Sequence, residues 1–330
     1  IWIVNSRDLI DHPDHRSAHK TSTPTMAGVA FFCTFILAVF FIKQWDKDLI
    51  SINLVASITV IFIIGLKDDL VMSTPKAKII GEIVAISFIL LCTCMQVNSL
   101  QGFLGIDTLP TIVSYVLTVL MILTIINSYN LLDGIDGLLS TVGILVFSVY
   151  SFIFFKLDLF FYFLLCLSLI GILLAYLRFN FSSSQKIFMG DTGSLIIGFC
   201  IGFFTLKFLS LDVSLIESSF LLPENKVTII AAILFIPLLD TIRVMGVRLL
   251  NKKSPFHPDR NHLHHILIDL KIPHYKASLL LGFINISIVI FTFYLSSKFN
   301  SFILLGLLFI IFLVFLGLFN ILTTSKKEFN

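Results

Sequence analysis

The sequence predicts an all-α protein, a polytopic bundle of transmembrane helices. Hydrophobic residues make up 57% of the 330 residues and charged residues only 13%, whereas charged residues are about a quarter of a typical soluble domain. Apolar runs recur along the whole chain, and runs of about 17 to 22 residues are long enough to cross the hydrocarbon core as helices. The short alternating strands that indicate a membrane barrel are not found in the sequence.

Ten apolar runs are each expected to form one membrane-spanning helix, because a segment in lipid must satisfy its backbone hydrogen bonds internally. Their approximate ranges are 27–42, 49–66, 79–95, 109–127, 138–155, 159–177, 193–209, 227–245, 277–296 and 300–321. No repeat or long linker divides them, so residues 1–330 are predicted to form a single integral-membrane domain. The chain opens on a loop-like stretch at Ile1, and an eleventh helix is expected to precede it.

Lysine and arginine orient these spans. The loops alternate between two sides, and the set that holds the N-terminal stretch, the long loop 243–276 and the C-terminus carries 17 of the 23 Lys and Arg residues. The positive-inside rule places this set in the cytoplasm. Four polar motifs lie in it or at its border: the pair Asp68-Asp69 and the runs 127–138, 188–194 and 257–265. The motifs are therefore predicted to meet at the cytoplasmic face.

Carboxylates in two of the motifs are candidates for metal binding or proton transfer. Asp68 and Asp69 end an apolar run, where charges often simply stop a helix. Adjacent carboxylates repel each other unless a cation is near, and acid pairs bind Mg²⁺ or accept a proton from a nucleophile. Asp191 precedes a span that begins near Gly193. It is either an ordinary N-cap or a ligand of a metal that bridges phosphates at a helix N-terminus.

The run 127–138 combines polar residues with glycines. Asn130, Asp133 and Asp136 are three residues apart, so a helix would place them on one ridge. Gly134 and Gly137 allow a ligand or another backbone to approach closely. This regularity favours a binding function over a solvated loop.

Histidines gather in the longest cytoplasmic loop. His257, His262, His264 and His265 are compatible with a zinc site or with a site for a pyrophosphate or sugar. The last three lie too close together for most structural zinc patterns, and no cysteine accompanies them. With Arg260 nearby, anion binding is the favoured hypothesis.

The cysteines are predicted to be small residues of the buried core rather than metal ligands or disulfide partners. All five, Cys33, Cys92, Cys94, Cys166 and Cys200, fall within predicted spans. Cys92 and Cys94 are two residues apart and would point in different directions on a helix.

At the four polar motifs the chain resembles the polyprenyl-phosphate N-acetylhexosamine-1-phosphate transferases, or glycosyltransferase family 4. The resemblance is closest to the bacterial UDP-GlcNAc:undecaprenyl-phosphate GlcNAc-1-phosphate transferases. It extends from VNSRDLIDHPDHRSAHKTSTPTMAG to HPDRNHLHH, and therefore over nearly the whole chain. Many relatives extend the acidic pair by a third acid, whereas this chain has Met72 at that position.

The resemblance implies a role for each matching residue. Asp68 and Asp69 match the acidic pair that activates the lipid phosphate, and Asp191 matches the aspartate that binds Mg²⁺. The expected substrate-binding residues are Asn130 and Asp133 for the nucleotide and its phosphates, Asp136 for the uracil, Phe188 for stacking on the base, Lys78 for a phosphate, and Arg260, His264 and His265 for the sugar pyrophosphate. His262 belongs to the last group and is expected to act in catalysis.

The implied reaction is a Mg²⁺-dependent transfer of HexNAc-1-phosphate, in the first place GlcNAc-1-phosphate, from a UDP-sugar to undecaprenyl phosphate. It releases UMP and initiates the synthesis of a cell-envelope polysaccharide. Mn²⁺ is expected to substitute for Mg²⁺. Whether catalysis is one displacement or passes through an aspartyl-phosphate stays open, as does the identity of the HexNAc.

The implied location is the bacterial inner membrane, with the active site on the cytoplasmic face. The expected partners are the UDP-HexNAc, undecaprenyl phosphate and the lipid bilayer. A homodimer is one assembly to test, and no nucleic-acid partner is expected.

A transporter of an anionic or phosphorylated solute is the alternative function. Transporters place ionisable residues or broken helices near the bilayer midplane. Glu82, Lys207 and Asp240 fall within predicted spans, and each is expected near a span end. This placement favours the enzyme. A purely structural membrane protein would not explain the helical spacing of Asn130, Asp133 and Asp136.

Overall fold

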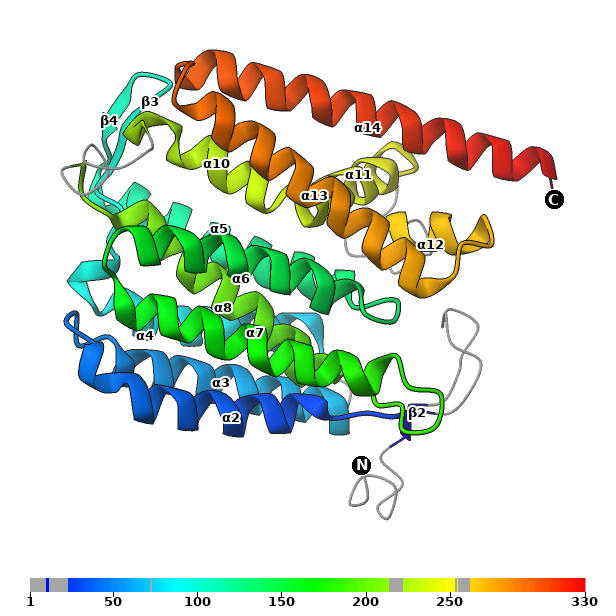
Figure 1. The fold of residues 1–330 in the computed structure, drawn as a ribbon, viewed down its shortest axis with the longest axis horizontal. Coiled ribbons are helices and arrows are strands. Elements are labelled where there is room, and N and C mark those ends of the chain that lie inside the picture. The colour runs from blue at the N-terminus through cyan, green and yellow to red at the C-terminus, as the bar shows by residue number, and fades with distance from the viewer. Residues whose placement is uncertain are drawn as a thin grey trace.

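The computed structural model of the protein describes residues 10–11, 23–71, 73–213, 222–252, 254 and 262–329. It confirms the all-α prediction, because long helices packed side by side form most of the described chain (Figure 1). Eight of the described helices are long and apolar enough to cross a membrane, and a bent pair of helices adds a ninth candidate span. Met72, His257 and Arg260 lie outside the described residues.

Each predicted span corresponds to a helix or a helix pair. The long elements are α2 (Ala27–Ile42), α3 (Ser51–Leu70), α4 (Pro75–Leu90), α5 (Thr111–Leu132), α6 (Leu138–Lys156), α7 (Phe160–Asn180), α8 (Gly190–Ser210), α10 (Lys226–Ile233), α11 (Phe235–Leu250), α13 (His274–Ser296) and α14 (Ser301–Phe329). Helix α4 has 16 residues, about 24 Å at 1.5 Å per residue, and it is not among the eight described helices that are each long enough to cross a membrane.

Short elements lie at the two ends of the bundle. They are the 3₁₀ turns η1 (Lys43–Trp45), η2 (Thr93–Met95) and η3 (Pro223–Asn225), the helix α12 (Leu263–Asp269), and the strands β1 (Ile10–Asp11), β2 (Thr23–Pro24), β3 (Ser99–Phe103) and β4 (Ile106–Thr108). The antiparallel pair β3–β4 lies at the left end of Figure 1, whereas β2 and α12 lie at the right end. The polar motifs gather at the right end.

Helix α8 is the centre of the bundle. In its membrane-spanning window 94% of the residues are buried, and it contacts α2, α3, α5 and α6. Close approach depends on glycines: a Cβ on Gly65 of α3 would lie 2.5 Å from the Cα of Thr192, and one on Gly198 would lie 2.9 Å from the Cα of Ile126. The end of α3 is therefore fixed against the start of α8.

We expect Gly65→Ala to lower the free energy of unfolding by about 1 to 3 kcal/mol, because the added methyl group would overlap a backbone atom that cannot rotate away. Gly171→Ala in α7 is the matched control, since a Cβ there meets nothing within 4 Å. Thermal unfolding in detergent measures the difference. Equal melting temperatures for the two variants would contradict the tight α3–α8 contact.

The prediction of one continuous helix over 227–245 is wrong. The chain breaks at Leu234, and α10 and α11 meet at an angle of 68°. Pro237 lacks an N–H group and its ring clashes with the carbonyl four residues earlier, that of Ile233. Asn285 of α13 satisfies the freed groups: its Nδ2 donates to Ile233 O at 3.0 Å, and its Oδ1 accepts from Ile236 N at 3.0 Å.

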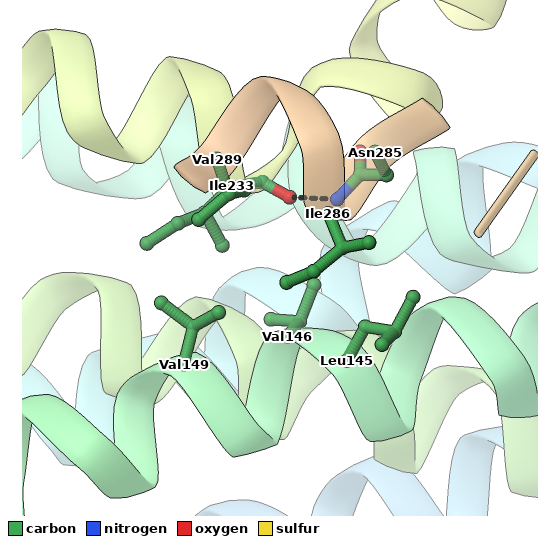
Figure 2. Close-up of a pocket in the computed structure, with 7 residues that line it drawn as sticks. All are labelled: Leu145, Val146, Val149, Ile233, Asn285, Ile286 and Val289. Atoms are coloured by element: carbon green, nitrogen blue, oxygen red, sulfur yellow. Dashed lines mark hydrogen bonds between the residues drawn. The ribbon is translucent and has the colours of Figure 1, made fainter. Parts of the chain in front are cut away.

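Figure 2 shows the Asn285 amide at this break, beside a narrow crevice between α6, α10 and α13. The other residues that line the crevice are apolar: Leu145, Val146, Val149, Ile233, Ile286 and Val289. The crevice is thus a gap in the side-chain packing around the break. The break itself redirects α11 toward α5.

Two of the three charges expected near span ends lie elsewhere. Glu82 is midway along α4, fully buried, and accepts a hydrogen bond from Asn127 at 3.0 Å. Asp240 lies in the second turn of α11, beyond the break. Only the prediction for Lys207 is confirmed: it lies in the last turn of α8 and pairs with Asp48 at 2.6 Å. The two errors arose because the helix boundaries differ from the predicted ones.

The cysteine prediction is confirmed for Cys166 and Cys200, which are buried. It is wrong for Cys33, which is exposed on α2, and for Cys92 and Cys94, which form a disulfide. The helix that was assumed for the pair ends at Leu90. Cys92 is extended, with φ −88° and ψ 121°, and this brings the two Cα atoms to 5.3 Å.

Candidate active site

The acidic pair and residues 188–194, the FMGDTGS motif, form one unit. Asp69, in the last turn of α3, accepts hydrogen bonds from the amides of Asp191 at 2.7 Å and Thr192 at 3.1 Å. It also accepts one from the Thr192 hydroxyl. Asp69 therefore caps the N-terminus of α8, where four backbone N–H groups have no partner within the helix. The hypothesis that Asp191 is itself the N-cap is wrong, because Asp191 lies in the first turn.

Lys78 lies between two carboxylates. Its Nζ is 3.0 Å from Asp68 Oδ2 and 3.5 Å from Asp191 Oδ2. Thr74 caps α4 and Pro75 starts it, which places Lys78 at the end of its first turn facing α3. Ser73 N donates to the other oxygen of Asp68 at 2.8 Å. The Asp191 side chain is 38% exposed, against 12% for Asp68, and is therefore the carboxylate more open to a ligand.

Asn130 joins this group from α5. Its Nδ2 donates to Asp191 Oδ1 at 2.7 Å and to Ser194 Oγ at 2.8 Å. One carboxylate thus receives the Asn130 amide on one oxygen and faces Lys78 with the other. The structure brings together Asp68, Asn130 and Asp191, which the motifs placed at one membrane face, and adds Lys78 from α4.

The single ridge predicted for the run 127–138 is wrong. Helix α5 ends at Leu132, so Asn130 is helical, Asp133 is the C-cap and Asp136 lies in the turn before α6. Gly137 has φ 75°, a backbone conformation that glycine adopts readily, and its N–H donates to Asn180 Oδ1 at 2.7 Å. The glycines bend the chain, so the three polar side chains reach different partners.

Asp136 belongs to a second group, next to the first. Its Oδ2 accepts from Lys186 Nζ at 2.7 Å and lies 3.1 Å from His274 Nδ1. Burial acts to raise the pKa of Asp136, but the hydrogen bonds from His274 and Lys186 outweigh it and hold this pKa below its ordinary value. Lys186 Nζ also lies over the ring of Phe188, 5.3 Å from its centroid. Asp136 and Phe188, both expected at the uracil, are therefore neighbours through Lys186.

The environment of Asp133 disfavours its ionised form. Part of the residue is accessible to solvent, but the surrounding protein weakens its hydration, and the carboxylates of Asp191, Asp69 and Asp136 repel it. These effects raise the pKa of Asp133 to about 7. The balance of charge here favours the approach of a cation.

The carboxylates of Asp133 and Asp191 are chemically suited to Mg²⁺. Among the described residues, no three His, Cys, Asp or Glu side chains form a preformed metal cluster. Mg²⁺ does not need one, since proteins often hold it by one or two carboxylates together with water and substrate phosphates. Asp191 is partly exposed, and its charge and that of Asp133 repel each other, so Asp191 is the residue that would hold the ion.

The described histidines of the 257–265 motif pack together over the α5–α6 turn. The ring of His264 lies 5.6 Å from that of His262 and 4.3 Å from that of His265, measured between centroids. His264 contacts Gly134 so closely that a Cβ there would be 2.1 Å from its Nε2. Burial, with help from neighbouring His265, lowers the pKa of His264 to about 3. His264 is therefore neutral at physiological pH, beside Asp133.

Several residues of the site were not predicted from the sequence. Thr192 and Ser194 lie within the FMGDTGS motif, and Lys186 lies two residues before it, so proximity to the motif was a usable signal. His274 and Asn180 gave no signal, because their partners are distant in sequence.

Asp240 carried a usable signal in the sequence, because a charge inside an apolar span is costly and is commonly functional. In the structure its carboxylate lies 2.8 Å from His262 Nδ1.

Comparison with known proteins first defines the class. Residues 51–209, from the start of α3 to the last turn of α8, match the profile of glycosyl transferase family 4. The relatives described next match most of the chain as well. The protein belongs to glycosyl transferase family 4.

The names of individual relatives describe a particular activity within this family. The undecaprenyl-phosphate alpha-N-acetylglucosaminyl 1-phosphate transferase of Pasteurella multocida is 36% identical over 292 residues, 85% of this chain and 77% of the relative. The protein of the same name from Haemophilus influenzae is 31% identical over 86% of this chain and 78% of its own length. A probable undecaprenyl-phosphate N-acetylglucosaminyl 1-phosphate transferase of Bacillus subtilis is 28% identical over 83% and 75%. These matches confirm the family that the motifs indicated, and they do not support the transporter alternative.

Proposed function

We propose that this protein transfers HexNAc-1-phosphate, in the first place GlcNAc-1-phosphate, from a UDP-sugar to undecaprenyl phosphate and releases UMP. The proposal rests on the names of its relatives. The observation that carries it is the arrangement of Lys78 between Asp68 and Asp191, with Asn130 on the other oxygen of Asp191. The product would initiate the synthesis of a cell-envelope polysaccharide.

In the proposed reaction an oxygen of the lipid phosphate attacks the β-phosphorus of the UDP-sugar. A new P–O bond forms to the lipid, the bond from the β-phosphorus to the bridging oxygen breaks, and UMP leaves. One pyrophosphate is exchanged for another, so the protein contributes mainly positioning and neutralisation of charge. When bound at Asp191, Mg²⁺ would supply positive charge to the pyrophosphate oxygens.

The two aspartates of the acidic pair, Asp68 and Asp69, have different roles in this proposal. Both oxygens of Asp69 accept hydrogen bonds from the start of α8, so Asp69 holds Asp191 in place. Asp68 faces Lys78 instead, and we assign to it the role of orienting the lipid phosphate or taking its proton. Lys78 then offsets the negative charge that develops in the transition state.

The second group of residues would receive the donor. Phe188 offers a ring for the uracil and Asp136 an acceptor for its N–H group. Lys186, which covers the Phe188 ring and pairs with Asp136, would move aside when the base stacks. Asp133 and Asn130 would contact the phosphates, and the loop with Arg260, His264 and His265 would contact the sugar pyrophosphate, with His262 acting in catalysis.

The site would face the cytoplasm of a bacterial inner membrane, since the loops on its side carry 17 of the 23 Lys and Arg residues. Both substrates fit this position: a soluble nucleotide sugar reaches the polar end of the bundle, and the polyprenyl tail stays in the bilayer. A homodimer remains an assembly to test by mass measurement in detergent.

A transfer assay tests the proposal. Membranes that contain the full chain would receive undecaprenyl phosphate, Mg²⁺ and a panel of labelled UDP-HexNAc donors, with Asp68→Asn as the inactive control. We expect label in the lipid phase from UDP-GlcNAc or a related donor, lost in the control variant. Chelation should abolish transfer, and added Mg²⁺ or Mn²⁺ should restore it. Folded protein that transfers label from none of the donors would overturn the proposal.

A further inference from the structure

His262 is held at two points by a single carboxylate. Its Nδ1 lies 2.8 Å from Asp240 Oδ2, and the backbone N–H of the next residue, Leu263, donates to Asp240 Oδ1 at 2.9 Å. Both His262 and Asp240 are buried, with 5% and 3% of their surfaces exposed. One bond fixes the ring and the other fixes the first turn of α12, so the carboxylate sets both the place and the rotation of the imidazole.

This contact selects one tautomer of the histidine. Arg243, one turn further along α11, places its Nη2 3.5 Å from Asp240 Oδ1 and stabilises the ionised carboxylate. An ionised carboxylate only accepts hydrogen bonds, so the proton in the contact belongs to Nδ1 of His262. The other nitrogen, Nε2, is then the one free to accept or deliver a proton, as in other enzymes where a carboxylate orients a histidine.

Packing contacts link His262 to the part of the site around Asp133, where the phosphates of the donor would bind. Its ring stacks parallel to that of His264, at an interplanar angle of 7°. His264 in turn presses on Gly134, next to Asp133. A change in the protonation of the His262 ring therefore takes place close to Asp133, which the donor's phosphates would approach.

The helix that carries Asp240 has other anchors. The neighbouring Thr241 donates to Ser128 Oγ of α5 at 3.0 Å, and Asn285 holds the backbone at Ile236. Loss of the Asp240 charge therefore leaves α11 attached to the bundle. A substitution that keeps the shape of Asp240 separates its effect on His262 from its effect on the fold.

We propose that Asp240 is a positioning residue that keeps His262 in the tautomer protonated on Nδ1, and that the transfer reaction depends on this tautomer. The second half of the proposal rests on the proposed function, whereas the first half does not. The shape-conserving variant Asp240→Asn is informative because Leu263 N would continue to donate to the amide oxygen. The NH₂ group would then face Nδ1 of His262 and favour the opposite tautomer.

Nitrogen NMR of the purified full chain, with ¹⁵N-labelled histidine, tests the first half without any substrate. Comparison with His262→Gln assigns the ring signals. We expect a protonated Nδ1 in the wild-type protein and a proton shifted to Nε2 in Asp240→Asn. The control Thr241→Val removes a buried hydrogen bond from the same helix and should leave the His262 signals unchanged. The same tautomer in wild type and Asp240→Asn would overturn the assignment, whether or not the protein shows transfer activity.

Steady-state kinetics test the second half. Asp240→Asn is expected to lower kcat about 100-fold or more, as mis-set tautomers do in other enzymes, with KM for the donor changed less than about threefold. In a His262→Gln background the same substitution should cost nothing further, because the two residues act as one unit. Independent, additive losses, or a loss confined to KM, would show that Asp240 does not act through His262.

Discussion

Asp191→Asn is expected to reduce transfer about 1,000-fold, equivalent to about 4 kcal/mol of transition-state stabilisation, while the protein stays folded. The amide oxygen of the replacement can still accept the hydrogen bond from Asn130, and Lys78 keeps Asp68 as a partner. What is lost is the partly exposed negative charge that would hold Mg²⁺. Initial rates measured against Mg²⁺ concentration give both the loss of rate and the change in metal dependence.

The control for this prediction is Asp48→Asn at the opposite end of the bundle. It also removes a carboxylate paired with a lysine, since Asp48 Oδ2 lies 2.6 Å from Lys207 Nζ. We expect this variant to retain transfer activity. An Asp191→Asn protein with an unchanged Mg²⁺ dependence would show that Asp191 is not the metal ligand.

Asp69→Ala is expected to lose both stability and activity. The substitution removes the acceptor for two backbone amides and a hydroxyl at the start of α8. Loss of an N-cap, with donors left unsatisfied, costs about 2 kcal/mol. Because Asp191 lies in the turn that would fray, we also expect transfer to fall at least about 100-fold. Thermal unfolding and transfer rates of the same preparation measure the two effects.

Asp46→Ala is the matched control, because Asp46 caps α3 in the same way, by accepting from Ile50 N at 3.2 Å and Ser51 N at 2.7 Å. It should lose a similar amount of stability and keep its activity well below its melting temperature. If Asp69→Ala were as stable as the wild type, the capping role would be refuted. If it lost stability but transferred at the normal rate, its link to Asp191 would be refuted.

Much of the fold follows from local properties of the sequence. A run of about 20 apolar residues must be helical in lipid, and this alone locates most of the bundle. The break between α10 and α11 depends on Pro237, which was visible in the sequence. It also depends on Asn285, which accepts a hydrogen bond from the amide of Ile236, 49 residues away. Propensity within one segment cannot reveal such a partner, so the bend was missed.

The site was predictable in its membership more than in its geometry. The motifs identified Asp68, Asp69, Asn130 and Asp191, and the structure brings them together. That Asp69 caps a helix by accepting from an amide 122 residues further along depends on tertiary packing, which places the end of α3 beside Thr192. The spacing of Asn130, Asp133 and Asp136 suggested a helix because its period is correct, but the glycines between them end that helix at Leu132.

The central claim is that the bond broken in the donor lies at the β-phosphorus. The most direct measurement supplies UDP-GlcNAc labelled with ³²P in its β-phosphate, together with undecaprenyl phosphate, to the purified protein. The account predicts that the label enters the lipid phase as a sugar-bearing lipid pyrophosphate and that unlabelled UMP appears in an equal amount. Release of labelled UDP, with the sugar alone on the lipid, would mean that a glycosyl group is transferred without its phosphate and would contradict the account.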